Sequence, residues 1–181
     1  IRTNTIDTLM VFTALGKMYR LVVDQVPTGT NSSRGVAIHT LVKMEEHDKA
    51  IAITSLKRKT DAEFVVSVSE QGMIKKTKLE EYMKAKKSGI AAVGLREGDS
   101  IANIVFIKDE QLILVSEKGM SIRFKTYNIG SVGRTAIGVR GMKIAEGDRV
   151  VAALPISKDT DELAIFSQYG MAKRTSLKEY P

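Results

Sequence analysis

A short hairpin pattern is repeated along the chain, and this repetition constrains the fold more than any other feature. Its clearest copy, Leu112 to Lys125, has four apolar residues, a turn that ends at Gly119, and an arm in which apolar and cationic residues alternate. An unbroken apolar run is typical of a strand buried on both faces, and alternation is typical of a strand with one face in solvent. Glycine suits the turn because it adopts positive φ without strain. Each copy therefore predicts a β-hairpin.

The copies keep the same phase when the turn glycine is taken as the origin. The glycines are Gly16, Gly72, Gly119 and Gly170, at spacings of 56, 47 and 51 residues. A hydroxyl residue stands three positions before each of them: Thr13, Ser69, Ser116 and Ser167. A cation stands four positions after each of them: Arg20, Lys76, Arg123 and Arg174. Because several residue types recur together, we interpret the copies as true repeats.

The rest of each repeat predicts a second pair of strands. In the first three repeats these are Val36–Val42 with Ala50–Ser55, Gly89–Leu95 with Ile101–Ile107, and Gly138–Ile144 with Val150–Ile156. The connection Glu80–Ser88 is polar and predicts a helical turn. Four-stranded units arrayed around an axis are typical of propellers.

We therefore expect an all-β fold, a propeller-like or β-pinwheel array of four-stranded blades. Residues 1–181 would form a single repeat domain with approximate repeats 6–60, 61–108, 109–158 and 159–181. The last repeat stops after its first hairpin, so the array would be incomplete, with about three and a half to four blades.

Composition restricts the kinds of partner and cofactor that the chain can bind. The chain has no cysteine, which excludes a disulfide framework and a thiolate metal site. No apolar run approaches the roughly 18 residues of a membrane span, so we expect a cytoplasmic protein with no membrane partner. The start at Ile1 suggests a fragment of a longer protein. A formal net charge of +7 favours a polyanionic partner.

Charge is sorted by position within the repeat. The six residues after each hairpin glycine contain nine cations and no acid among 24 positions, whereas acids gather in other turns such as Glu97–Asp99 and Glu146–Asp148. If the repeats surround an axis, one basic arm from each unit would form a belt suited to a bent phosphate backbone. The alternative is that these cations only protect edge strands from aggregation.

A glycine-rich loop, Ser131–Gly141, is a second candidate. Its glycines, with Arg134 and Arg140, could form a backbone nest for a phosphate, although the Gly-Lys-Ser/Thr ending of a nucleotide-binding loop is missing. The alternative is an ordinary loop with a glycine bulge. Arg34 and the pair Lys86–Lys87 occupy the corresponding loops of the earlier repeats.

Signals for catalysis are weak. His39 and His47 have no partner at a ligand-like spacing, and no serine lies in a nucleophile-elbow pattern. We therefore predict no catalytic residue, metal site or cofactor within this chain.

These features resemble the family of DNA gyrase A C-terminal domains. The matching stretches are FTALGKMYRL, SEQGMIKKTKLEEY, SEKGMSIRFK, VGRTAIGVRGMKIAEGDRVV and QYGMAKRTSLKEYP. GRTAIGVRG followed by EGD is the most specific of them. The resemblance implies a β-pinwheel whose blades exchange a strand and around whose basic rim duplex DNA wraps, in support of negative supercoiling.

The resemblance also implies that chemistry takes place elsewhere in a larger enzyme. The parent would be an ATP-dependent type II DNA topoisomerase, with gyrase B and the rest of gyrase A as partners in a heterotetramer and with ATP and Mg²⁺ as cofactors. The catalytic tyrosine of that enzyme follows an arginine, and none of the five tyrosines here does. The family's signature basic, glycine-rich box does not occur in this sequence either.

We expect ten cations to contact the DNA backbone. The main contacts are predicted at Arg20, Lys76, Arg123 and Arg174, with Lys78, Lys125, Lys173, Arg34, Arg134 and Arg140 in support. Two alternatives stay open: a propeller scaffold that binds acidic proteins, and the corresponding domain of topoisomerase IV.

Overall fold

The computed structural model describes residues 1, 3–56, 61–83, 88–108 and 110–180. Its strands are β1 (Thr8–Thr13), β2 (Lys17–Val22), β3 (Ala50–Leu56), β4 (Phe64–Ser69), β5 (Met73–Lys78), β6 (Ile90–Ala91), β7 (Ile101–Ile107), β8 (Gln111–Ser116), β9 (Ser121–Lys125), β10 (Val139–Arg140), β11 (Val150–Ile156), β12 (Glu162–Phe166) and β13 (Ala172–Ser176). Its helical turns are η1 (Val23–Gln25), α1 (Ile38–Leu41), α2 (Glu80–Met83), η2 (Thr126–Asn128) and η3 (Leu177–Glu179).

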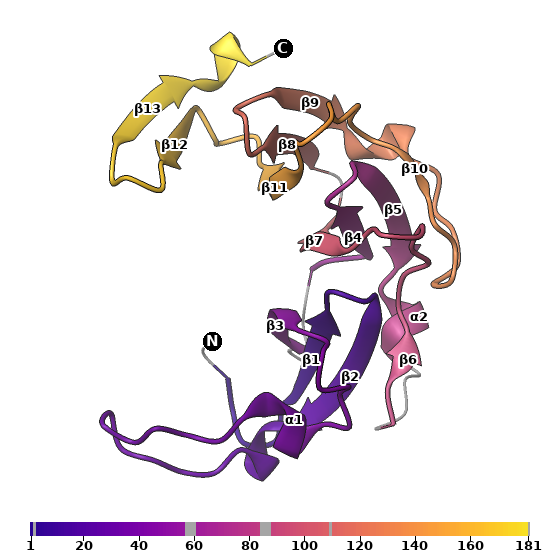
Figure 1. The fold of residues 1–181 in the computed structure, drawn as a ribbon, viewed down its shortest axis with the longest axis vertical. Helices are drawn as coiled ribbons and strands as arrows, with labels where there is room; N and C mark the ends of the chain where they lie inside the picture. The colour runs from indigo at the N-terminus through magenta and orange to yellow at the C-terminus, as the bar shows by residue number, and fades with distance from the viewer. Residues whose placement is uncertain (2, 57–60, 84–87, 109, 181) are drawn as a thin grey trace.

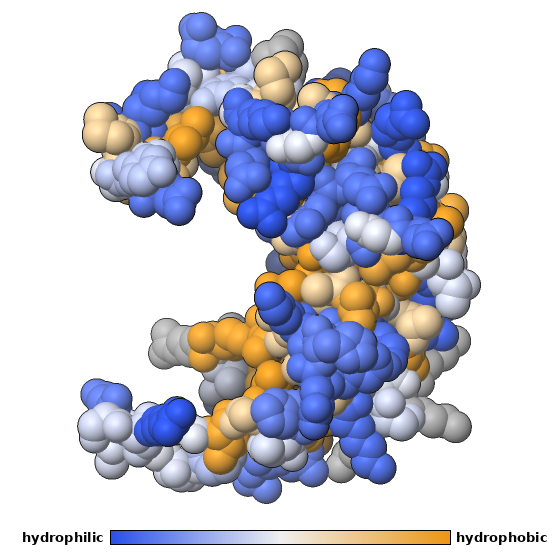
Figure 2. Space-filling model, viewed as in Figure 1, coloured by the Kyte–Doolittle hydropathy of each residue, from blue (hydrophilic) through white to orange (hydrophobic). Residues whose placement is uncertain are grey.

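The strands form four sheets, which we call blades 1 to 4. Their strand orders are β3-β1-β2-β6, β7-β4-β5-β10, β11-β8-β9 and β12-β13. The blades follow one another along an arc, with β3, β7, β11 and β12 on the concave side and β2, β5, β9 and β13 on the convex side (Figure 1). Figure 2 shows the same arc as a crescent that is hollowed on its concave side. The predicted all-β array of hairpin-based blades is confirmed.

Each predicted hairpin is present, and its turn explains the recurring glycine and hydroxyl. The four turn glycines have φ between 75° and 85°. In every turn the hydroxyl oxygen accepts a backbone amide four residues ahead: Lys17 to Thr13 at 3.2 Å, Met73 to Ser69 at 3.1 Å, Met120 to Ser116 at 3.2 Å and Met171 to Ser167 at 3.1 Å. The hydroxyl residue therefore closes the turn that the glycine makes possible.

Consecutive repeats exchange a strand, as the resemblance implied. The outermost strand of blade 1 is β6, which belongs to the second repeat, and its Ile90 pairs with Met18 of β2. In the same way β10 of the third repeat pairs with β5, placing Val139 opposite Ile74. Among the described residues, blade 3 has three strands and blade 4 has two.

The prediction of a strand at Val36–Val42 is wrong, because residues 38–41 form the helical turn α1. Ile38 precedes Asp48 by the same ten residues that separate Gly89 from Asp99, so α1 takes the place of the exchanged strand. The equivalent strands β6 and β10 each pair with the hairpin of the preceding repeat. The side chains of Ile38 and Leu41 instead pack beside Val42. The helical turn predicted in Glu80–Ser88 is confirmed by α2.

Three of the four hydrophobic cores join neighbouring blades, and the fourth consists of residues of the first repeat alone. Val65 of β4 packs with Met10 and Phe12 of blade 1, while its neighbour Val66 packs with Leu112 of blade 3. Both valines are fully buried, so β4 has a core on each face, as its unbroken apolar run predicts. Burying one such aliphatic side chain contributes about 1.5–3 kcal/mol. Stacking of the blades therefore supplies most of the apolar burial and fixes which strands reach the convex side.

Candidate nucleic-acid interface

The predicted DNA-contacting residues are concentrated on the outer arms β2, β5, β9 and β13, which lie along the convex side of the arc (Figure 1). The structure divides these residues into cations that are engaged with the next blade and cations that are exposed. Three of the four residues that the sequence predicts as main DNA contacts belong to the engaged group.

The cations four positions after the hairpin glycine reach the backbone of the following blade. The donor-acceptor pairs are Arg20 Nη1 with the Met83 carbonyl at 2.9 Å, Lys76 Nζ with the Thr126 carbonyl at 2.8 Å, and Arg123 Nη1 with the Leu177 carbonyl at 2.9 Å. Arg20 and Arg123 are half-buried. These three residues share a structural role that the sequence pattern does not indicate.

Lys76 is the most enclosed of them. Its residue is only 8% exposed, and its ammonium lies 4.9 Å from the centroid of the Phe64 ring. A cation over an aromatic face is attracted by the ring quadrupole, which adds to the bond with Thr126. Its ammonium would have to leave these partners before it could reach a phosphate in solvent.

Arg174 occupies the equivalent position in the fourth repeat but is exposed. Its guanidinium lies 3.4 Å from the carboxylate of Glu162, on the neighbouring strand of the same hairpin. Solvent-exposed ion pairs are worth about 0–1 kcal/mol, so this contact does not prevent exchange for a phosphate.

Lys78, Lys125 and Lys173 are exposed on the same outer arms. The ammonium of Lys78 lies 3.7 Å from the carboxylate of Glu80, and that of Lys125 lies 5.7 Å from the centroid of the Tyr127 ring. Both contacts are on the surface and are screened by salt. These lysines therefore present positive charge on the convex side.

The glycine-rich loop is held against blades 1 and 2 by its backbone. Val132 donates its amide to the Lys76 carbonyl at 2.9 Å, and Ala136 accepts the Gly94 amide at 3.1 Å. Arg134 is half-buried and donates from Nη1 to the Ala91 carbonyl at 3.2 Å, whereas Arg140 on β10 is exposed. The predicted phosphate nest stays a prediction, and the loop is firmly positioned.

Lys75 lies beneath this loop and is absent from the predicted site residues. It is 1% exposed, and its ammonium donates to the Ala92 carbonyl at 2.7 Å and also to the Arg134 carbonyl. Burial, assisted by the positive charge of Arg134, lowers the pKa of Lys75 to about 8. Lys75 and Lys76 are adjacent in a strand and therefore point to opposite faces of the sheet. This alternation is the sequence signal that the two lysines have different partners.

Arg34 lies exposed in the long connection between η1 and α1. It precedes Asp48 by the same number of residues that separate Arg134 from Asp148, so the two arginines are equivalent in the repeat. The paired lysines Lys86 and Lys87, predicted for the corresponding loop, lie outside the described residues.

Comparison with known proteins identifies the family. A family model described as "DNA gyrase C-terminal domain, beta-propeller" matches residues 7–57, 63–108, 110–157 and 161–181. The chain belongs to this family.

Similarity to individual members extends along nearly all of the chain. It is 32% identical over 183 residues to DNA gyrase A of Lawsonia intracellularis, covering 99% of this chain and 22% of that protein. It therefore spans about a fifth of the length of the curated relatives that it matches. Among solved structures, the C-terminal domain of DNA topoisomerase IV superposes with a TM-score of 0.86 at 25% identity, covering 99% of this chain and 56% of that one. A DNA gyrase A C-terminal domain superposes with a TM-score of 0.78 at 27% identity, covering 98% and 57%.

The acidic turns of this gyrase-family domain hold the fold together. The Asp99 carboxylate accepts the Gln71 amide at 3.1 Å and the Ser100 amide at 2.8 Å, which ties the turn after the exchanged segment to the hairpin turn. Asp48 and Asp148 do the same in their own repeats. No three His, Asp or Glu residues in the described part of the chain are grouped so as to hold a metal ion. No helix among the described residues is long and apolar enough to cross a membrane.

Proposed function

We propose that this chain is a DNA-wrapping domain of a type IIA topoisomerase, which binds duplex DNA without sequence preference along the convex side of its arc. The observation that carries the proposal is the placement of all four outer arms on that side (Figure 1), together with the exposed cations on three of them, β5, β9 and β13. Membership of the gyrase C-terminal family supports it. We further propose that the parent is an ATP- and Mg²⁺-dependent topoisomerase in the cytoplasm, with gyrase B and the rest of gyrase A as partners, and that residues 1–181 are one repeat domain within it.

A curved row of modest contacts fits the energetics of wrapping. Duplex DNA carries one negative charge per about 1.7 Å of helix axis, so a row of cations meets phosphates along its whole length. Bending a site of roughly 20–30 base pairs costs on the order of 1–6 kcal/mol. Phosphate contacts carry no sequence information, which suits a domain that has to bend any sequence.

The exposed cations are the ones that we expect to contact phosphates. They are Lys78, Lys125, Lys173, Arg174, Arg34 and Arg140, with the half-buried Arg134 beside them. Lys76 makes no phosphate contact in this proposal, because its ammonium is enclosed between Phe64 and Thr126. The proposal thus shifts the main contacts away from the position that recurs most strictly in the sequence.

Salt dependence of binding tests the proposal. Replacing Lys78 and Lys125 by glutamine should make the plot of log affinity against log salt concentration less steep by about 0.9 for each lost phosphate contact. The matched control replaces Lys49 and Lys158, two exposed lysines that adjoin the concave-side strands β3 and β11. We expect the control pair to leave the slope close to its original value, measured on random-sequence duplexes.

Two outcomes would count against the proposal. Equal changes in slope for both pairs would show that only net charge matters, and an unchanged slope for Lys78 and Lys125 would remove the convex side from the interface. Wrapping itself is tested by circularising DNA in the presence of the domain and measuring the linking number, which should shift if the bound duplex follows the arc.

A further inference from the structure

One type of contact crosses every boundary between consecutive blades. The cation four positions after a hairpin glycine donates to a backbone carbonyl in the helical turn that follows the outer arm of the next repeat. Boundaries 1–2, 2–3 and 3–4 carry Arg20 with Met83, Lys76 with Thr126, and Arg123 with Leu177. The contact recurs although the cation changes between arginine and lysine and the turn changes between α2 and the 3₁₀ turns η2 and η3.

The cation lies on the face that packs against the following blade. Across the hairpin, Arg20 stands opposite Met10, Lys76 opposite Val66, and Arg123 opposite Ile113. Each of these three partners is buried in the core that joins its blade to the next one. Directly opposed residues share a face of an antiparallel sheet, so the cations point toward the next blade.

The acceptor carbonyl also belongs to the turn's own hydrogen bond at two of the boundaries. Thr126 accepts the Ile129 amide at 3.1 Å and Leu177 accepts the Tyr180 amide at 3.2 Å, each in addition to the cation. A carbonyl oxygen has two lone pairs, and a charged donor makes a stronger bond than a neutral one. The cation therefore fixes both the turn and the distance between the blades.

We propose that Arg20, Lys76 and Arg123 are positioning residues that latch each blade to the turn of the next, and are not phosphate ligands. Each latch holds the outer arm of the following blade in its place on the convex side. The inference goes beyond the proposed function, because it concerns how the arc is assembled and holds whether or not DNA is bound.

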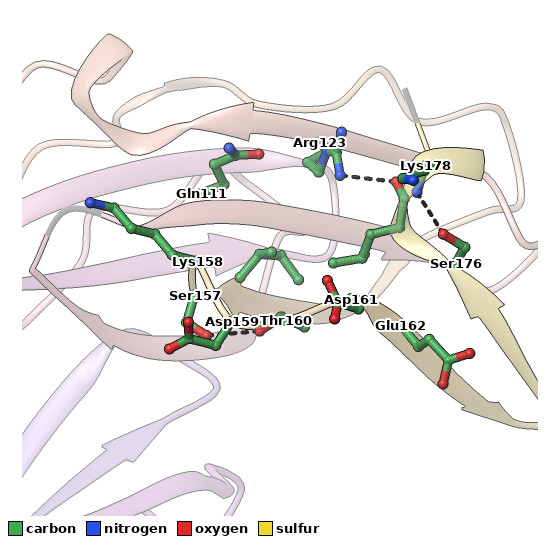
Figure 3. A pocket seen from close by; sticks show the side chains of 12 residues that line it. Gln111, Arg123, Ser157, Lys158, Asp159, Thr160, Asp161, Glu162, Ser176 and Lys178 are labelled. Atoms are coloured by element: carbon green, nitrogen blue, oxygen red, sulfur yellow. Dashed lines mark hydrogen bonds between the residues drawn. The ribbon is translucent and has the colours of Figure 1, made fainter.

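Boundary 3–4 gives the clearest test. At the other boundaries an exchanged segment adds backbone bonds; the Gly72 carbonyl, for example, accepts the amides of Gly141 and Met142 at 2.9 and 3.1 Å. Among the described residues, the Arg123–Leu177 contact is the hydrogen bond that joins blade 3 to blade 4. Arg123 and Leu177 both line a hollow of 1070 Å³ between the two blades, and the dashed line from the guanidinium of Arg123 in Figure 3 marks this hydrogen bond.

Three variants separate a latch from a phosphate ligand. Arg123→Met removes the donor, Arg123→Lys keeps one, and Lys125→Met removes an exposed cation two residues away. Residue-resolved amide hydrogen exchange should accelerate by about tenfold at Leu177–Tyr180 in Arg123→Met, because a bond to a charged donor is lost. Arg123→Lys should exchange nearly as the unchanged chain does, since Lys76 performs the same task one boundary earlier.

DNA binding provides the opposing readout. Arg123→Met should leave the slope of log affinity against log salt concentration unchanged, whereas Lys125→Met should make that slope less steep by about 0.9. If the fourth hairpin of Arg123→Met exchanges as an unfolded segment, Arg123→Lys should restore it, and its failure to do so would overturn the latch. A fourth variant, Lys76→Met, tests boundary 2–3. It should accelerate amide exchange at Thr126–Ile129, while the shared core keeps blades 2 and 3 together.

Two further results would overturn the proposal. One is amide exchange in Arg123→Met that matches the unchanged chain. The other is a loss of salt-dependence slope in Arg123→Met as large as that in Lys125→Met, which would make Arg123 a phosphate ligand.

Discussion

A Cβ atom on Gly16 would lie 2.7 Å from the carbonyl oxygen of Val93. The exchanged segment of the second repeat lies directly on the first hairpin turn, where the Gly16 carbonyl accepts the amides of Ala92 and Val93 at 2.8 and 3.0 Å. Gly119 has a similar backbone conformation, with φ of 85° against 75° for Gly16, yet no atom lies within 4 Å of its Cβ position. The two glycines therefore differ in packing and hardly at all in backbone strain.

This difference predicts unequal costs for the same substitution. Gly119→Ala should lower the free energy of unfolding by about 1–2 kcal/mol, the cost of placing a Cβ in the left-handed region. Gly16→Ala should cost more, because the new methyl group also displaces the backbone of the exchanged segment. Urea denaturation of both variants measures the difference, and equal losses would show that the exchanged segment does not press on the first turn.

The Asp99 carboxylate predicts a second asymmetry, within a single turn. Asp99 is 8% exposed and accepts the amides of Gln71 and Ser100, whereas Glu97 two residues earlier is exposed. Asp99→Ala should lower the free energy of unfolding by about 1–3 kcal/mol, because the amides lose a charged acceptor. Glu97→Ala should stay within about 0.5 kcal/mol of the unchanged chain. A similar small effect for both variants would reduce Asp99 to an ordinary surface acid.

Lys75 predicts a rise in stability with pH. The unfolded chain keeps the Lys75 proton up to its ordinary pKa of 10.5, whereas burial and Arg134 lower the folded pKa to about 8. Between these values the unfolded state binds more protons, so the free energy of unfolding increases as pH rises. Relative to Lys75→Met, the increase should approach about 1.4 kcal/mol per pH unit at most.

The measurement belongs between the folded pKa of Lys75, about 8, and the ordinary pKa of tyrosine, 10.0. Burial raises the pKa of the nearby Tyr82, whose hydroxyl shares the Ala92 carbonyl with Lys75, to about 12. Above pH 10.0 the unfolded chain releases the tyrosine proton first, so Tyr82 lowers the stability as pH rises further. Parallel pH profiles for the unchanged chain and Lys75→Met would show that Lys75 keeps its ordinary pKa in the folded state.

The parts of the fold that local patterns determine could be predicted from the sequence. The hairpin at Gly72 needs only its glycine, its hydroxyl and its alternating arm, and these lie within a few residues of one another. The helical turn at residues 38–41 could not be predicted in this way, because the same place in later repeats becomes a strand only when a preceding hairpin pairs with it. Extended or helical structure there depends on a partner that a local pattern does not contain.

The candidate interface, too, could be predicted only where local pattern determines it. The recurrence of a cation after each glycine predicts binding, yet Lys76 is on the face that its strand neighbour Ile74 buries against the next blade. The sequence carries no general signal for this, because Arg123 also reaches the next blade and has the polar Ser121 two positions before it. Lys78 lies at the end of the same strand and is exposed. No cation recurs at its position in every repeat, so its place in the interface becomes evident only once the blades are assembled into the arc.

Ile113 and Leu112 predict different local consequences of the same substitution, by alanine. Both are fully buried neighbours on β8, but Ile113 packs with Leu163 and Leu177 of blade 4, whereas Leu112 packs with the core shared with blade 2. Either residue replaced by alanine should lower the free energy of unfolding by about 2–5 kcal/mol. Only Ile113→Ala should also loosen the fourth hairpin, which proteolysis under native conditions would detect as faster cleavage in the connection Ser157–Asp161. Equal cleavage in the two variants would mean that blade 4 is held by contacts other than this core, and that the arc unfolds as one cooperative unit.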